Sequence, residues 1–265
     1  MTIATEARID VRLDRRGVAS VTIDNAARLN SLGSGLLADF VEAIDRLGND
    51  PSLRAVVVTG AGERAFVGGA DIREMAQIDG PDAARAFITG VHRACAAVRA
   101  CPVPVIARIQ GYCFGAGLEL AAACDFRIAS ERAELGMPEV RLGIPSVVEA
   151  ALLPALIGWG RTRRLLLTGE TIDAEAALSW GLVEEVTAAD ELDDAVEACL
   201  ADILACGPAA VRAQKALIAA WETLPLAQAI DAGVEAFASA YLTDEPKRMM
   251  AEFLASQAAR KAGKR

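Results

Sequence analysis

Two short apolar runs, each followed by a glycine-rich segment, constrain this chain most. The runs are residues 54–59 (RAVVVT) and 104–109 (PVIARI), and the segments are residues 60–71 and 111–117. Continuous β-branched runs of this length are typical of strands buried in a parallel sheet. Glycine lets the backbone come close to a neighbouring group. The sequence therefore predicts buried strands followed by close-packed loops over these two segments.

The remaining pattern predicts strands and helices in the first half of the chain and helices alone in the second. We expect a hairpin of strands 8–13 and 18–24, helices over 36–47, 83–98 and 118–123, and a strand over 126–129. Further helices are expected after Asp173 as far as Gly181, and over 196–205, 209–221, 226–241 and 246–261. This order indicates an α/β fold with a helical C-terminal part. We place the boundary between regions 1–195 and 196–265.

Composition excludes several classes of function. The 265 residues carry a net charge of −9, which argues against nonspecific binding of nucleic acid or anionic membranes. No run reaches the ~18–20 apolar residues that a membrane helix needs. The first 18 residues have no apolar stretch, which predicts no secretory signal. A single histidine and six cysteines without a CxxC pair favour reduced, buried thiols, no metal site and a cytoplasmic protein.

The second glycine segment precedes a predicted helix. Free N–H groups at the start of that helix would point at one place, which is a natural site for an anion or an oxyanion. Two N–H groups from separate loops can clamp one carbonyl oxygen as it gains charge. A single loop of this kind is a weak signal, because such turns also bind phosphates or bind nothing.

Two glutamates accompany these loops. Glu119 lies in an apolar run (GLELAAAC) just inside the predicted helix. It either complements the helix dipole or is kept for chemistry, and both interpretations remain open. Glu139 follows Pro138 before a predicted apolar helix, and by itself it favours a surface-loop acid.

Five segments resemble, in order, those of the enoyl-CoA hydratase/isomerase (crotonase) family. They are NAARLNSL (25–32), AFVGGADI (65–72), GYCFGAGLELAAACD (111–125), LGMPEVRLGI (135–144) and TGETIDAEAALSWGLVEEV (168–186). The resemblance covers nearly the whole chain. It implies a spiral core of ββα turns and a helical C-terminal region that assembles trimers into a hexamer.

The resemblance also implies a site. It places the oxyanion-binding N–H groups at Ala70 and Ala116 and the catalytic acids at Glu119 and Glu139. Keeping both acids resembles the hydratases of the family, which work on acyl-CoA thioesters in fatty acid metabolism without a separate cofactor. The residues that would contact the CoA thioester are Arg28, Leu29, Gly68, Asp71, Ile72, Gly115 and Phe253. For two of them a second interpretation stays open: Arg28 as a solvated loop charge and Phe253 as a residue that only packs its helix.

The expected reaction is syn addition of water to a 2-enoyl-CoA. Glu119 would deprotonate the water, and Glu139 would deliver a proton to C2. Other thioester enzymes of the family remain alternatives: an enoyl-CoA isomerase, a CoA-thioester hydrolase, or a hydratase with a specialised substrate. RNA binding conflicts with the acidic charge, and neither glycine segment has the G-x-G-x-x-G spacing of dinucleotide sites.

One segment departs from the family. Its usual glycine cluster is replaced here by residues 145–150 (PSVVEA). Glu149 is then either a third acid in the pocket or, as Ser146-x-x-Glu149, part of a capping box that opens a helix, and the capping box is favoured. His92 is expected to be an ordinary helix residue, and Asp125 is expected to make a structural contact.

Overall fold

The computed structural model describes residues 7–262, with side chains as far as residue 260. Residues 1–6, part of the stretch on which the absence of a secretory signal was predicted, lie outside it. The chain divides into two compact units, of which the first ends at Leu200 and the second begins at Ala201. The division falls inside helix α7 (Leu192–Ala205), a few residues after the boundary expected from sequence.

The larger sheet of the first unit has the strand order β1-β2-β3-β5-β7-β10. Its strands are β1 (Arg8–Leu13), β2 (Val18–Asp24), β3 (Ala55–Gly60), β5 (Val105–Ile109), β7 (Phe126–Ser130) and β10 (Glu185–Thr187). Strand β1 is antiparallel to β2, and every later pair is parallel. The parallel strands β3 and β5 are almost wholly buried, as the apolar runs predict.

A smaller sheet has the order β4-β6-β8-β9. Its strands are β4 (Ala65–Val67), β6 (Tyr112–Phe114), β8 (Glu134–Gly136) and β9 (Thr171–Asp173). The successive pairs β3–β4, β5–β6 and β7–β8 each place one strand in each sheet before the chain enters a helix. This repetition confirms the expected ββα turns.

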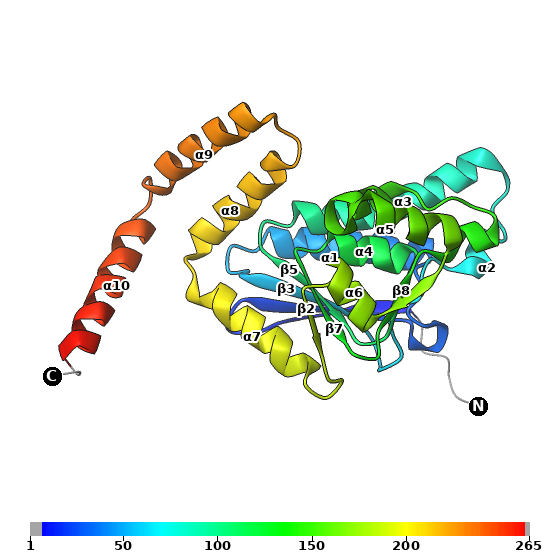
Figure 1. Cartoon of the computed structure of the whole chain (residues 1–265), viewed down its shortest axis with the longest axis horizontal. Coiled ribbons are helices and arrows are strands. Elements are labelled where there is room, and N and C mark those ends of the chain that lie inside the picture. The colour runs from blue at the N-terminus through cyan, green and yellow to red at the C-terminus, as the bar shows by residue number, and fades with distance from the viewer. Residues whose placement is uncertain (1–6, 263–265) are drawn as a thin grey trace. The chain divides into compact units, whose positions relative to one another are not determined.

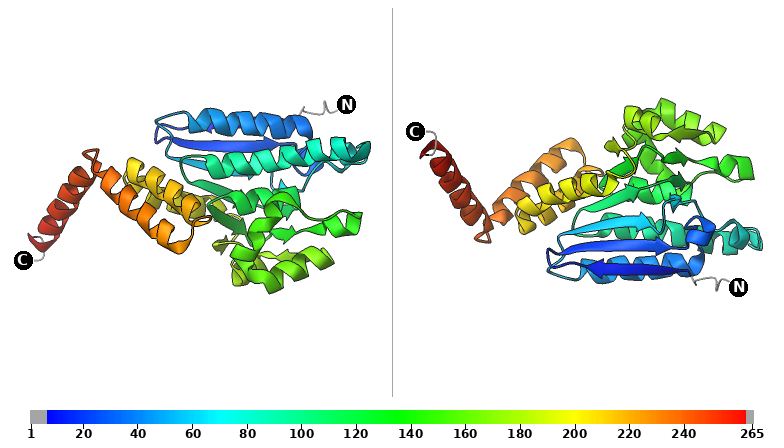
Figure 2. Two further views of the ribbon diagram at one scale, coloured as in Figure 1. Left: turned by 90° about the horizontal axis from the view of Figure 1, so that it is seen from above. Right: turned by 90° about the horizontal axis from the view of Figure 1, so that it is seen from below.

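Helices α1 (Ser34–Gly48) and α3 (Gly80–Ala100) lie side by side (Figures 1 and 2), and α1 also packs on β1 and β2. The other helices of the first unit are α2 (Ile72–Met75), α4 (Ala116–Ala123), α5 (Leu153–Thr168) and α6 (Ala174–Trp180). The second unit contains α8 (Pro208–Trp221), α9 (Leu226–Ala240) and α10 (Glu245–Ala262). None of the helices over residues 7–262 is long and apolar enough to cross a membrane.

The two segments predicted as loops are not loops throughout. Residues 65–67 form β4 and residues 112–114 form β6, which pair with each other. Strands of three residues carry too few side chains for a readable alternation, and glycines on both sides hide them further. The backbone hydrogen bonds of the small sheet therefore decide the structure here, rather than local propensity.

Two buried amides fix the chain ahead of β4. The Asn30 side chain donates to the carbonyls of Ala61 and Ala65, at 3.1 and 2.8 Å. The Gln110 side chain donates to Gly60 at 2.8 Å and to Ala65 at 2.6 Å. Both side chains are almost fully buried. Because a buried carbonyl without a partner is costly, these amides determine where the following glycines lie.

Candidate active site

A cavity of about 660 Å³ lies where the two glycine segments meet. Of the residues predicted to form the site, seven line it: Gly68, Ala70, Ile72, Gly115, Ala116, Glu119 and Glu139. Most of the remaining wall is apolar and comes from α3 and from the segment after Glu139, including Phe87, Ile88, Val91, Leu142, Ile144 and Val147. An apolar cavity with a few converging polar groups is the usual form of a small-molecule site.

The two glycine segments touch directly. A Cβ on Gly117 would lie 2.2 Å from the carbonyl oxygen of Val67, so only glycine permits this approach. The contact brings the chain after β4 against the first turn of α4. It therefore places Ala70 and Ala116 on the wall of one cavity.

Both of these alanines have a free backbone donor. The bridge between Leu32 and residues 69–71 uses the N–H groups of Leu32 and Asp71, and Ala70 lies between the two bonds. Ala116 is the first residue of α4. Within residues 7–262, neither the Ala70 nor the Ala116 N–H donates a hydrogen bond. Two unpaired donors on one wall can bind an oxygen that carries negative charge.

Glu139 lies over Gly115. A Cβ on this glycine would be 2.3 Å from Oε1 of Glu139, and its backbone has φ = +51°, which side chains rarely adopt. The Oγ of Ser146 donates to Oε2 of Glu139 at 2.8 Å. Glu139 follows Pro138 in a short 3₁₀ turn, η2 (Pro138–Leu142), and is half-buried rather than a surface acid.

Glu119 is 4% exposed and lies in the first turn of α4. Burial, and after it the charges of Glu139 and Glu149, raise the pKa of its carboxyl to about 8 against a smaller lowering by backbone donors. One of those donors is the Ala150 N–H, 3.3 Å from Oε1. A carboxyl with this pKa keeps its proton at neutral pH. The helix-dipole interpretation explains its place in the first turn but not its burial.

The other predicted residues lie beside the cavity or apart from it. Arg28 forms an exposed ion pair with Asp71 at 3.1 Å, and Asp71 also caps α2 by accepting from the Arg73 N–H at 2.9 Å. The carbonyl of Leu29 accepts from the Gly68 N–H at 2.8 Å. Phe253 is on α10 in the second unit and is 60% exposed. Their contact with CoA stays a prediction.

The predicted capping box is wrong. The 3₁₀ turn η3 (Val148–Leu152) begins after Val147 without a side-chain cap, because the Ser146 hydroxyl bonds Glu139 instead. Glu149 is 7% exposed, and its Oε1 lies 2.8 Å from Nδ1 of His92. The available sequence signal was an acid flanked by apolar residues on both sides, as at Glu119. Asp125 makes the expected structural contact, accepting from the Val105 N–H at 2.7 Å.

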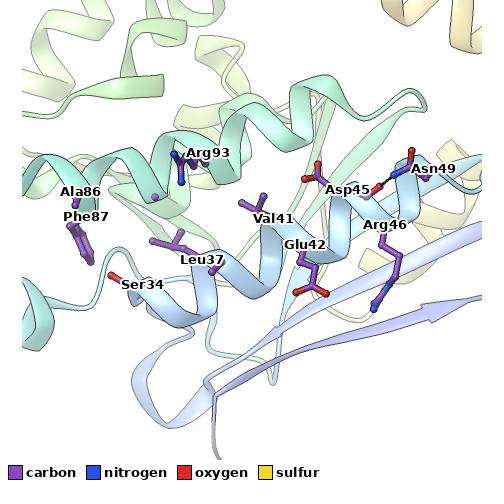
Figure 3. Close-up of a pocket in the computed structure, with 12 residues that line it drawn as sticks. Ser34, Leu37, Val41, Glu42, Asp45, Arg46, Asn49, Ala86, Phe87 and Arg93 are labelled. Atoms are coloured by element: carbon purple, nitrogen blue, oxygen red, sulfur yellow. Dashed lines mark hydrogen bonds between the residues drawn. The ribbon is translucent and has the colours of Figure 1, made fainter.

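A second groove of about 570 Å³ runs between α1 and α3 (Figure 3). Leu37, Val41 and Phe87 form its apolar part, and Glu42 and Arg93 are among its charged residues. None of the residues that line it comes from the two glycine segments. Over residues 7–262, no group of three His, Cys, Asp or Glu side chains is placed to hold a metal ion.

Comparison with known proteins identifies the family. The sequence profile of the enoyl-CoA hydratase/isomerase family matches residues 14–260. The short-chain-enoyl-CoA hydratase of Clostridium acetobutylicum is 35% identical over 92% of this chain and 94% of its own length. The crotonyl-CoA hydratase of Syntrophomonas wolfei is 34% identical over 89% of this chain and 91% of its own length.

Solved structures give the same result. An enoyl-CoA hydratase from Bacillus anthracis superimposes with a TM-score of 0.90 at 32% identity, covering 94% of this chain and 96% of the other. One from Mycobacterium smegmatis gives a TM-score of 0.91 at 29% identity, covering 95% and 97%. The two sheets of ββα turns, the paired acids and these matches together show that the chain belongs to the enoyl-CoA hydratase/isomerase family and has the crotonase fold.

Proposed function

We propose that this protein is an enoyl-CoA hydratase, a hydro-lyase that adds water across the 2,3-double bond of a 2-enoyl-CoA thioester. One observation carries the proposal: Glu119 and Glu139 line the same apolar cavity as two unpaired backbone N–H groups. Two relatives support it, one named a short-chain-enoyl-CoA hydratase and the other a crotonyl-CoA hydratase. An isomerase needs only one acid for proton transfer. Hydration gives the second acid a role, because one carboxyl takes a proton from water and the other gives a proton to C2.

The donors act on the thioester carbonyl. The N–H groups of Ala70 and Ala116 would bind the carbonyl oxygen and hold it more strongly as it becomes an enolate, so they lower the barrier rather than only binding substrate. Drawing charge onto that oxygen leaves C3 electron-poor and open to attack by water.

The two acids transfer protons through one bridging water. Because Glu119 holds a proton near neutral pH, the bridging water first passes that proton to Glu139. Glu119 then takes a proton from the water as its oxygen bonds C3, and Glu139 gives its proton to C2 on the same face, which restores the starting state of both acids. Because the pKa of Glu119 is about 8, its carboxyl brings one proton to the pair at neutral pH. One carboxyl is then available as acid and the other as base, and the bridging water lets them exchange these roles.

We also infer self-association and a cytoplasmic setting. Helix α9 presents a row of exposed apolar side chains at helical spacing: Leu226, Ile230, Val234 and Phe237 are each at least 60% exposed. A surface of this kind usually marks an interface, which supports the trimer or hexamer expected for the family. The mostly buried cysteines support a reducing compartment. No cofactor besides the CoA of the substrate is expected.

Replacing either acid by its amide should abolish most of the activity. We expect Glu119→Gln and Glu139→Gln each to lower kcat for crotonyl-CoA hydration about 10²- to 10⁴-fold, because each removes a proton transfer. Loss of the conjugated absorbance measures the rate. Glu131→Gln, a change at an exposed turn outside the cavity, is the matched control. Rates within tenfold of the parent in both variants would contradict the paired-acid mechanism.

Removing one backbone donor tests the oxyanion site. Ala116→Pro deletes the N–H at the first position of α4, where a helix tolerates proline well. We expect kcat to fall about 10²- to 10³-fold, the usual effect of one such donor. Ala116→Gly keeps the N–H and should stay near the parental rate. Equal activity in the two variants would show that this N–H does not bind the carbonyl oxygen.

The pH dependence follows from the raised pKa of Glu119. Glu119 keeps its proton up to about pH 8 and loses it above that pH. With no proton left to deliver, kcat should fall about tenfold per pH unit above pH 8. Rates measured from pH 6 to 10, with return to pH 7 to check for inactivation, test this. A kcat that stays constant to pH 10 would contradict it.

A further inference from the structure

The segment that departs from the family contacts both acids. We call residues 146–150 the bracket. At one end the Ser146 hydroxyl donates to Oε2 of Glu139 at 2.8 Å, and at the other the Ala150 N–H donates to Oε1 of Glu119 at 3.3 Å. Five consecutive residues therefore hold the two carboxyls whose relative position decides whether one water can bridge them.

The bracket is strained between these two contacts. Val148 has φ = +39°, in the left-handed region that a β-branched residue almost never enters. Such a conformation persists only when surrounding contacts impose it, and it is found most often at functional sites. The bracket therefore needs an anchor outside itself.

Glu149 supplies that anchor. Its side chain is 9% exposed, and Oε1 lies 2.8 Å from Nδ1 of His92 on α3. Its Oε2 is buried and, among the described residues, has no partner at ordinary hydrogen-bond geometry, although the weakly donating thiol of Cys95 also interacts with this carboxyl. A carboxyl buried with half its bonding capacity unused is costly, and packing alone would favour an apolar residue here.

The charge of Glu149 changes the pKa of groups in and near the site. It acts on Glu119 of α4 and on the buried Cys95 thiol of α3, raising the pKa of both after the larger effect of burial. His92, with half of its side chain in solvent, is the partner that faces Glu149 from α3. The ionisable residues of α5, which continues from the bracket, begin only at Arg161, beyond its first two turns.

We propose that Glu149 is a positioning residue: its pairing with His92 fixes the bracket, and the bracket holds Glu119 and Glu139 around the reacting water. The inference rests on the proposed hydratase function. It assigns roles to two residues that touch neither the substrate nor the reacting atoms. In this chain the bracket replaces the glycine cluster usual in the family, and the contact between Glu149 and His92 ties the bracket to α3.

Three single variants and one double variant separate the effect of the hydrogen bond from that of the charge. Glu149→Leu and His92→Phe each remove the hydrogen bond, so kcat for crotonyl-CoA should fall about tenfold to a hundredfold while KM stays within about threefold. The double variant should be no slower than the slower single one, because both break one contact. Glu149→Gln keeps an acceptor for His92, and its kcat at pH 7 should stay within about threefold of the parent.

The amide variant also has a signature that a purely structural residue would lack. Removing a negative charge near Glu119 favours ionisation of that carboxyl. The decline of kcat at high pH should therefore begin at a pH lower by roughly half a unit or more in Glu149→Gln. Arg93→Gln is the control, because Arg93 follows His92 on α3 but lines the α1–α3 groove (Figure 3). It should leave both kcat and the pH profile unchanged.

The outcomes are distinct. A parental kcat and pH profile in both Glu149→Gln and Glu149→Leu would overturn this inference while leaving the hydratase intact. Loss of activity in Glu149→Leu with an equal loss in Glu149→Gln and no shift in its pH profile would also overturn it. If the parent protein hydrates no enoyl-CoA, the proposed function fails and the inference fails with it.

Discussion

Gly117 packs directly against the carbonyl of Val67, and the positions of the other active-site groups depend on this contact. No side chain fits between these atoms, so the chain after β4 lies directly on the first turn of α4. This contact brings the free N–H groups of Ala70 and Ala116 to one wall. The buried amides of Asn30 and Gln110 supply the other half of the constraint, because both donate to the carbonyl of Ala65, the first residue of β4.

The three acids near this wall repel one another when they are ionised, and this repulsion lowers the stability of the fold. Glu119, Glu139 and Glu149 interact in an apolar environment, and their mutual repulsion adds to the effect of burial on Glu119. A site built for stability would avoid this arrangement. The proposed proton transfer needs this repulsion, because a carboxyl that keeps its proton near neutral pH can act as the acid of the pair.

Much of this could be read from sequence. The hairpin of β1 and β2 matched its expected bounds because alternation over six and seven residues is a clear signal. Glu119, Glu139 and the two alanines were found through long motifs, and the structure brings all four to one cavity. The three-residue strands β4, β6 and β8 were missed, since pairing between distant segments creates them.

The bracket shows a different limit. Ser146 and Glu149 have the spacing of a capping box, and local sequence favours that interpretation. The partners that decide otherwise are Glu139, seven residues before Ser146, and His92, which is 57 residues from Glu149. No pattern within a short window contains that information. Tertiary contacts direct the Ser146 and Glu149 side chains to these partners, so the segment does not form a capping box.

The central claim is that two acids pass one water to one face of an enoyl thioester. Hydration of crotonyl-CoA in D₂O, with the product analysed by proton NMR, tests it most directly. The account predicts 3-hydroxybutyryl-CoA with a single deuterium at C2, in one diastereomer, on the face that received the hydroxyl. A mixture of C2 diastereomers, deuterium at C4 instead, or release of free CoA without hydration would contradict it.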